Sequence, residues 1–159
     1  MTCVIGIDVG TTSTIGVLLD TKNDKVIKKK SINVNLFSIK EGWAEEDPNQ
    51  WWLNTKNIIK ELSKTAKLKK KKIIAIGTTG MLPALVIVDK KGKVIRRSIQ
   101  QSDSRTDKEL KKIFNKKNSS SFIKKTRCGI NQQLIAPKLI WLKTNEKNNF
   151  NKIYKIMGS

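Results

Sequence analysis

The segment Val4–Asp20, with the sequence VIGIDVGTTSTIGVLLD, restricts the fold more than any other part of the chain. Two runs rich in β-branched residues, Val4–Ile7 and Ser13–Leu19, lie on either side of a short turn that contains glycine and threonine. This arrangement is typical of a β-hairpin. The first run also brings the carboxylate of Asp8 to the turn. We therefore expect a hairpin whose turn gathers an acid, hydroxyl groups and accessible backbone.

A third run with alternating apolar residues, Val26–Leu36, extends the expected hairpin to a three-stranded meander. The stretch EGWAEEDPNQWW then carries the signals of a helix start. Asp47 is a good N-cap, Pro48 fits the first helical position and Gln50 has capping-box spacing. The helix should bury one apolar face, which carries Trp51, Ile58, Leu62 and Ala66.

Shorter apolar runs follow in the second half of the chain. Ile73–Ile76 is wholly apolar, which predicts a strand buried on both faces. MLPALVIVDKKGKVI predicts a strand, a Lys-Lys-Gly turn and a return strand. Thr106 is expected to be the N-cap of a helix through Asn115, which is followed by a linker rich in Ser, Asn and Lys and a short helix at Ser121–Thr126. The last expected elements are a helix in APKLIWLKTN with Pro137 in its first turn and a strand in KIYKIM.

The net charge of +20 comes from 33 lysines and arginines against 13 acidic residues in a chain of 159 residues. A strongly basic chain suggests a nucleic-acid partner. The excess is nearly all lysine, spread along the whole chain, and the only arginines are Arg96, Arg97, Arg105 and Arg127. Base readout favours grouped arginines and stacked aromatic residues. We therefore expect one globular domain with a lysine-rich composition and no specific nucleic-acid partner.

The sequence contains no histidine, which excludes a Ser-His-Asp triad and a histidine metal site and leaves carboxylates as the ordinary general bases. Cys3 and Cys128 lack metal-site spacing and are expected to be small buried residues in a reducing cytosol. Asp8 interrupts the only N-terminal apolar run, so no signal peptide is expected, and no run reaches membrane-spanning length. These features predict a cytoplasmic protein without a membrane partner.

The tryptophans and the acidic pair beside them are interpreted as structural. Trp51, Trp52 and Trp141 lie in expected helices and are predicted to be core residues. Trp43 is predicted to be an aromatic plug beside the helix cap. Glu45 and Glu46 are adjacent in the cap segment, so a general acid and base role is not expected for this pair.

The opening turn has the groups that bind phosphate and a divalent cation. Gly6 and Gly10 allow the backbone to approach a ligand closely, and Thr11–Ser13 offer hydroxyls and N–H donors for an anion. Asp8, at the end of the first run, can hold a hydrated Mg²⁺. The sequence has no Walker A motif. The alternative interpretation is a polar turn without a ligand.

Four stretches occur in an order and spacing that resemble the FGGY family of carbohydrate kinases. They are GIDVGTTSTIGVLLD, GWAEEDPNQWW, IGTTGMLPALVIVDKKGKVIRRSIQQSDSR and APKLIWLK, and the similarity covers essentially all 159 residues. The resemblance implies an α/β, actin-like (ribonuclease H-like) N-terminal domain, truncated, with a mixed sheet flanked by helices. Residues 1–159 would be part of the N-terminal domain of a two-domain enzyme that moves the γ-phosphate of ATP to a sugar or polyol hydroxyl.

The resemblance also implies which residues face the nucleotide. Asp8 would match the catalytic carboxylate near Mg²⁺ and the phosphates. Glycerol kinase, a family member, has an arginine two positions after the serine of this turn. This chain has Ile15 at that position, so that phosphate contact is absent. The catalytic base and the C-terminal nucleotide-binding domain are expected beyond Ser159, so the fragment alone should be nearly inactive. The implied ATP phosphate contacts are Gly10, Thr11, Thr12 and Ser13.

On the sugar side the resemblance implies contacts at Met81, Leu82, Gln101, Asp103 and Gln133. Met81 and Leu82 cannot donate hydrogen bonds through their side chains, whereas glycerol kinase has an Arg-Glu pair there and xylulokinase a Met-His pair. Polar contact would come from Gln101 and Asp103, and from Gln133, where glycerol kinase places a tyrosine. The alternative for these three residues is ordinary loop polarity. A ketopentose such as xylulose is the favoured substrate.

Three classes of function follow from these observations. The favoured one is an ATP-dependent sugar or polyol kinase with ATP and Mg²⁺ as cofactors and a small sugar or polyol as its partner. The alternative is an actin-like nucleotide-binding or scaffold protein that keeps the phosphate turn but does not phosphorylate sugar. The third is a basic nucleic-acid-binding module. A homodimer is left open.

Overall fold

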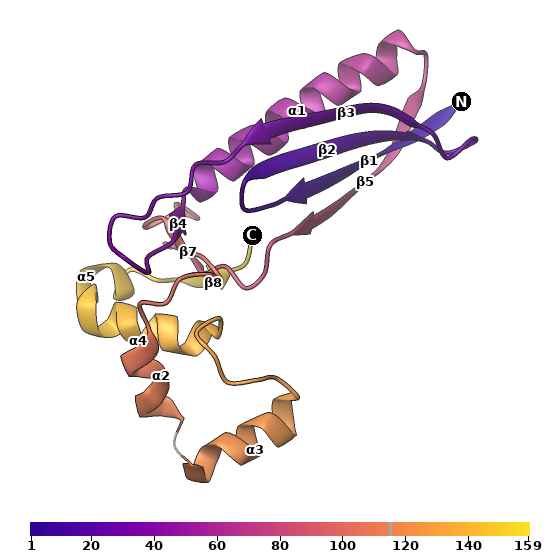
Figure 1. Cartoon of the computed structure of the whole chain (residues 1–159). Coiled ribbons are helices and arrows are strands. Elements are labelled where there is room, and N and C mark those ends of the chain that lie inside the picture. Colours follow the sequence, from indigo (N-terminus) through magenta and orange to yellow (C-terminus); the bar gives the residue numbers. More distant parts are fainter. Residues whose placement is uncertain (115) are drawn as a thin grey trace. The chain divides into compact units, whose positions relative to one another are not determined.

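The structure is a computed structural model that describes residues 1–114 and 116–159, and the side chains of all of these except 116–118. The chain divides into two compact units (Figure 1). The amino-terminal unit contains Met1–Leu36 and Asp47–Met81, and the second unit contains Phe37–Glu46 and Leu82–Ser159. Each unit is therefore assembled from two separate stretches of sequence.

The amino-terminal unit contains a four-stranded mixed sheet in the order β3-β2-β1-β5. β1 pairs with β2 and β2 with β3 in antiparallel fashion, whereas β1 and β5 are parallel. The expected hairpin and meander are confirmed. The third strand ends at Asn33 rather than Leu36, and the next residue, Val34, donates its N–H to Thr12 O in the turn before β2. The four strands are β1 (Thr2–Val9), β2 (Ser13–Asp20), β3 (Val26–Asn33) and β5 (Lys72–Gly80).

Helix α1 (Pro48–Leu68) runs along one face of this sheet (Figure 1). Successive side chains of a strand lie on opposite faces, so alternate residues of β1 and β2 point toward the helix. Gly16 of β2 permits close packing, since a Cβ atom there would lie 2.1 Å from Ile58 Cγ2 of α1. The resulting core contains Cys3, Ile5, Ile7 and Leu18 from the strands and Ile58, Leu62 and Ala66 from the helix.

Two of the three features predicted for the start of α1 are confirmed. Asp47 is the N-cap, and its Oδ1 accepts a hydrogen bond from Asn49 N at 2.9 Å. Pro48 occupies the first turn, where its missing N–H needs no partner. Gln50 does not complete a capping box, because its Oε1 accepts a hydrogen bond from Asn35 N at 3.0 Å instead. This contact fixes the end of the meander against the start of the helix.

Two predictions of burial are wrong in this unit. Trp52 is 62% exposed, because consecutive helical residues point about 100° apart and Trp51 is the buried one of the two. β5 is not buried on both faces, since Ile74 and Ile76 are 56% and 50% exposed. β5 forms the edge of the four-stranded sheet, and of its described residues Ile73 is the one that packs against the core beneath α1.

The second unit combines two small antiparallel ladders with short helices. The ladders pair β4 (Glu45–Glu46) with β7 (Ser98–Ile99) and β6 (Val86–Val88) with β8 (Lys155–Met157). Its core joins Leu85 and Ile87 to Ile99 and Leu142, with Trp141 partly buried against it. The helices of the described ranges are α2 (Asp107–Ile113), α3 (Lys116–Thr126), α4 (Ile135–Asn145) and α5 (Lys147–Phe150).

Several predicted boundaries in this unit differ from the structure. The return strand after the Lys-Lys-Gly turn is reduced to a single bridge between Val88 and Val94. α2 ends at Ile113, and Asn115 lies outside the described residues. α3 already begins at Lys116, so a helix takes the place of the linker that the polar composition predicts.

Other predictions for the second unit are confirmed in position. Pro137 lies in the first turn of α4, and β8 forms in the KIYKIM stretch. Thr106 is the N-cap of α2, although its hydroxyl makes no capping hydrogen bond. Cys3 of the first unit is buried, whereas Cys128 is exposed after the end of α3, so the predicted burial of Cys128 is wrong. Among the described residues, no helix has both the length and the apolar character needed to cross a membrane.

Candidate functional site

The turn between β1 and β2 is closed by its own backbone. Gly10 N donates a hydrogen bond to Ser13 O at 3.1 Å, and Thr12 O accepts one from Val34 N at 2.9 Å. Glycine keeps this turn free of a tight contact, because a Cβ atom at position 10 would lie 3.1 Å from Ser13 O. Thr11 and Thr12 are exposed. A fixed turn that presents hydroxyl residues to solvent suits the binding of an anion.

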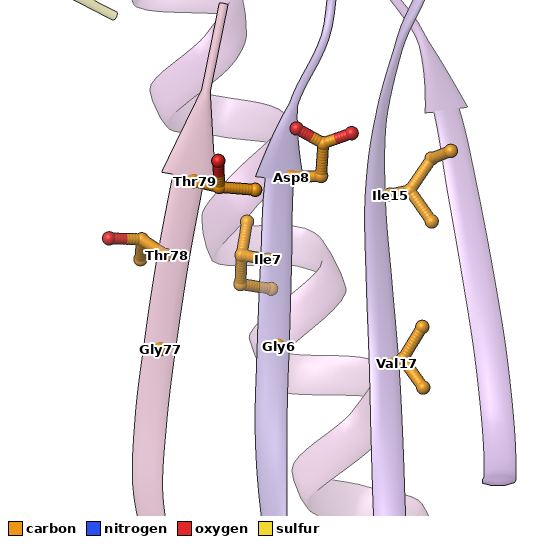
Figure 2. Close-up of a pocket in the computed structure, with 8 residues that line it drawn as sticks. All are labelled: Gly6, Ile7, Asp8, Ile15, Val17, Gly77, Thr78 and Thr79. Atoms are coloured by element: carbon orange, nitrogen blue, oxygen red, sulfur yellow. The ribbon is translucent and has the colours of Figure 1, made fainter.

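β5 ends beside this turn and brings further hydroxyls to it. Asp8 of β1 pairs with Thr79 of β5 across the two parallel strands. Figure 2 shows the Asp8 carboxylate and the Thr79 hydroxyl on neighbouring strands at the same end of the sheet. The next residue after β5, Met81, donates its N–H to Val9 O at 3.0 Å. One predicted sugar contact therefore begins directly beside the predicted phosphate turn.

Sequence reasoning missed Thr78 and Thr79, although a signal for them is present. Both β1 and β5 end near a Gly-Thr-Thr triplet, in VGTTS and IGTTG. Parallel strands finish at the same edge of a sheet, so two such triplets come together once β1 and β5 pair. Deciding that these two strands are neighbours requires knowing the strand order, which the local pattern does not contain.

A hollow of about 420 Å³ lies on the sheet beside these groups (Figure 2). Gly6 and Gly77 pair across β1 and β5, and a Cβ atom at either position would meet no atom within 4 Å. The floor of the hollow is therefore bare backbone. Asp8 and Thr79 supply polar groups to its lining. Ile15, the position where glycerol kinase has an arginine, pairs with Asp8 from β2 and also lines the hollow.

The Asp8 carboxylate is available for a cation. Asp8 is exposed, and none of the hydrogen bonds and ion pairs found among the described residues uses its carboxylate. The described part of the chain contains no group of three or more His, Cys, Asp or Glu side chains that could hold a metal. Mg²⁺ fits this setting, because it keeps several waters and takes one or two carboxylates together with phosphate oxygens.

The remaining predicted sugar contacts lie in the second unit and differ in exposure. Leu82 is 68% exposed and is joined to Pro83 by a cis peptide bond. Gln101 is partly buried in the loop after β7. Gln133 is exposed before α4, and its N–H donates to Asn131 Oδ1 at 2.9 Å. Their predicted contacts with sugar stay predictions.

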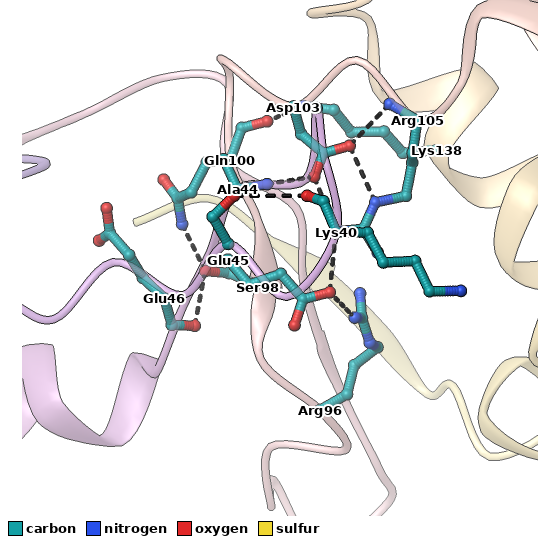
Figure 3. Close-up of polar contacts among 12 residues, drawn as sticks. Lys40, Ala44, Glu45, Glu46, Arg96, Ser98, Gln100, Asp103, Arg105 and Lys138 are labelled. Carbon is teal, nitrogen blue, oxygen red and sulfur yellow. Dashed lines mark hydrogen bonds and ion pairs between the residues drawn. The ribbon is translucent and has the colours of Figure 1, made fainter.

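Asp103 is completely buried, and both of its carboxylate oxygens accept hydrogen bonds within the unit (Figure 3). Oδ2 accepts from Ala44 N and from Arg105 Nη2, each at 2.7 Å. Oδ1 accepts from Arg105 N at 3.0 Å and from Arg105 Nε at 2.8 Å. Asp103 therefore organises the loop that carries Gln101, and a sugar contact by Asp103 itself stays a prediction.

The partner of Asp103, Arg105, is held between charges and rings. Its guanidinium lies 3.7 Å from the ring centre of Trp43 and 5.0 Å from that of Trp141, and Nη2 is 2.8 Å from Glu45 Oε1. Glu45 also forms an ion pair with Arg96. Trp43 thus has a packing role, as predicted, against Arg105 and Trp141, while its predicted position beside the helix cap stays a prediction. Glu45 is engaged as a structural anion. The pairing of Arg105 with these residues links positions far apart in the sequence.

Comparison with known proteins places these features in one family. A model described as the FGGY family of carbohydrate kinases, N-terminal domain, matches residues 3–159. The xylulose kinase of Staphylococcus xylosus is 32% identical over 157 residues, which cover 99% of this chain and 32% of that protein. The chain therefore spans about a third of the length of the curated relatives it matches.

Solved structures agree. The xylulose kinase from Rhodospirillum rubrum has a TM-score of 0.94 at 42% identity, covering 99% of this chain and 32% of that one. The Plasmodium falciparum glycerol kinase with ADP has a TM-score of 0.86 at 28% identity, covering 96% and 30%. The predicted actin-like fold, a mixed sheet with helices, is confirmed. The match along almost the whole chain shows that it belongs to the FGGY family of carbohydrate kinases and corresponds to its N-terminal domain.

Proposed function

We propose that the protein carrying this chain transfers the γ-phosphate of ATP to a hydroxyl of a sugar or polyol. The observation that carries the proposal is the pairing of β1 with β5. It brings Asp8, Thr79 and Met81 to the same end of one sheet, beside the turn. Relatives named xylulose kinase and glycerol kinase, one of them solved with ADP, support the same chemistry.

In this proposal the turn binds the phosphates of ATP. Gly10 closes the turn, so the hydroxyls of Thr11–Ser13 and the remaining backbone N–H groups of the turn contact phosphate oxygens. The Thr79 hydroxyl is a further donor beside them. Asp8 holds Mg²⁺, which when bound neutralises charge on the transferred phosphoryl group. Ile15 offers no charge, so the site depends on dipoles, hydroxyls and the Asp8 carboxylate.

The substrate side is a separate part of the proposal. Met81 and Leu82 give apolar contact, and Gln101 and Gln133 give hydrogen bonds to hydroxyls, with a ketopentose such as xylulose as the favoured substrate. The chain spans about a third of the length of its curated relatives, and in this proposal the general base and the adenine site lie outside residues 1–159. Phosphoryl transfer depends on positioning and charge stabilisation, so residues 1–159 alone should be nearly inactive.

A coupled ADP-release assay on the full-length protein tests the proposal across a panel of pentuloses and polyols. We expect ADP release that depends on at least one of these substrates and on Mg²⁺. ATP binding without stimulation by any member of the panel would contradict the kinase function. Nucleotide hydrolysis or filament formation that is independent of sugar would support the actin-like alternative instead.

A further inference from the structure

Lys138 is a charged residue in the interior of the second unit. It lies in the first turn of α4, one residue after Pro137, and its side chain is completely buried. A lysine is almost never fully buried without partners. Its partners here are two main-chain carbonyls. Nζ donates to Gln100 O at 2.8 Å (Figure 3) and to Pro83 O at 3.3 Å.

These two carbonyls lie just beyond the point where a backbone ladder ends. Leu85 and Ile99 exchange hydrogen bonds, with Leu85 N donating to Ile99 O at 2.9 Å and Ile99 N donating to Leu85 O at 3.1 Å. Pro83 has no N–H, so it cannot donate a further ladder bond, and Gln100 N donates instead to Ala44 O. The ammonium of Lys138 therefore ties the two segments together where the backbone does not.

The geometry points to Lys138 as a positioning residue for sugar binding, because its ammonium fixes the Leu82–Pro83 segment relative to the Gln100–Gln101 segment. Leu82 and Gln101, two of the predicted sugar contacts, are each one residue from a tethered carbonyl. Lys138 is wholly buried, so it acts through these segments and does not touch the sugar. This inference rests on the proposed kinase function.

Packing alone does not explain a charge at this position. Leu142, one turn further along the same face of α4, fills the core as an apolar residue, and a methionine has a volume similar to that of lysine. Burial lowers the pKa of Lys138 to about 8, with Asp103 opposing the decrease and Arg105 adding to it. The ammonium is therefore held at a free-energy cost, which the two carbonyl contacts offset.

Kinetics of Lys138→Met in the full-length protein test this role, with Lys143→Met as the matched control, since Lys143 is exposed on the same helix. We expect the KM for sugar to rise about tenfold, as for the loss of one charge-assisted hydrogen bond. The KM for ATP and kcat at saturating sugar should stay within about twofold of wild type. The Tm should fall by no more than a few degrees, because removing the buried charge partly offsets the loss of the donor to the two carbonyls. Lys143→Met should change none of these quantities.

Hydrogen–deuterium exchange without substrate gives a readout that is independent of catalysis. Peptides covering residues 81–85 and 100–103 should exchange faster in Lys138→Met than in wild type or Lys143→Met. Unchanged exchange in both segments overturns the tether, and an unchanged KM for sugar overturns the positioning role. If Lys138→Met does not fold, Lys138→Leu, which also lacks a donor, is measured in the same way, and no increase in exchange or KM overturns the inference. Absence of sugar-dependent turnover in the wild type would refute the proposed function instead. In that case hydrogen–deuterium exchange would still show whether Lys138 holds the two segments together.

Discussion

Replacing Gly16 by alanine tests the packing of α1 on the sheet. A Cβ atom at this position would lie 2.1 Å from Ile58 Cγ2, 3.1 Å from Leu62 Cδ1 and 3.2 Å from Ile7 Cδ1. Carbon atoms pack best at about 3.5–4.0 Å, so the closest contact has to open by about 1 Å or more. All three neighbours are buried in a close-packed core, which has no free space to accept the displacement.

The expected loss of stability follows from two opposing effects. Overpacking a core by a methyl group costs about 1–3 kcal/mol, and this contact is far inside the van der Waals distance. A glycine-to-alanine change without a clash instead stabilises by about 0.4–1 kcal/mol, because it restricts the unfolded chain. We therefore expect Gly16→Ala to lose about 3 kcal/mol, which corresponds to a Tm lower by roughly 6–12 °C in a chain of this size.

Gly77→Ala is the matched control, because Gly77 lies in the same sheet and a Cβ atom there meets no atom within 4 Å. Thermal and urea unfolding, followed by circular dichroism, should place this variant within about 0.5 kcal/mol of wild type. Ile58→Leu removes the Cγ2 branch, so the double variant with Gly16→Ala should recover part of the loss. Equal stability of Gly16→Ala and Gly77→Ala would refute the close contact between β2 and α1.

Two further predictions concern carboxylates of the amino-terminal unit. Asp8→Asn in the full-length protein should lower kcat by about 100-fold or more while the KM for sugar stays nearly constant, because charge stabilisation acts mainly in the transition state. Steady-state kinetics check this, and an unchanged kcat would remove Asp8 from the site. The hydrogen bond from Lys71 Nζ, at 2.6 Å, holds the pKa of Asp20 below its ordinary value. The stabilisation from this pair is therefore present above about pH 4 and is lost as the pH falls further, so Asp20→Asn should flatten the acid side of the stability curve measured by acid unfolding.

Local periodicity predicted the elements that lie close together in sequence. The hairpin of β1 and β2 and the buried face of α1 follow from patterns of two and 3.6 residues. The same geometry explains one error and one omission. Trp51 and Trp52 are consecutive, so they cannot share one helical face. Lys138 precedes Leu142 by four residues and therefore shares its buried face, which the search for apolar residues alone did not detect.

Contacts between distant segments could not be predicted in this way. Asp103 was predicted to contact sugar, with ordinary loop polarity as the alternative. Its structural role depends on Ala44 N and on Arg105 stacked against Trp43. No local pattern shows that residues from two separate stretches of sequence build one unit. The exposure of Cys128 is a further case, because an isolated cysteine carries no sequence signal of its surroundings.

The register of β5 against β1 is another feature that hydrophobic pattern does not reveal. Cys3 pairs with Ile73, but the next residue, Val4, pairs with Ala75. Ile74 is therefore an extra residue in β5, as in a β-bulge. The four-residue apolar run is thus better explained by a bulged edge strand than by a strand buried on both faces.

This bulge decides what lies at the candidate phosphate site. With the extra residue, Gly77 pairs with Gly6 and Thr79 pairs with Asp8. A register without it would shift β5 by one residue, so Ile76 would pair with Gly6 and its side chain would occupy the hollow. The bare backbone floor beside Asp8 therefore depends on one inserted residue several positions before the site. The edge strand β5 therefore sets the space that is available to a ligand beside Asp8.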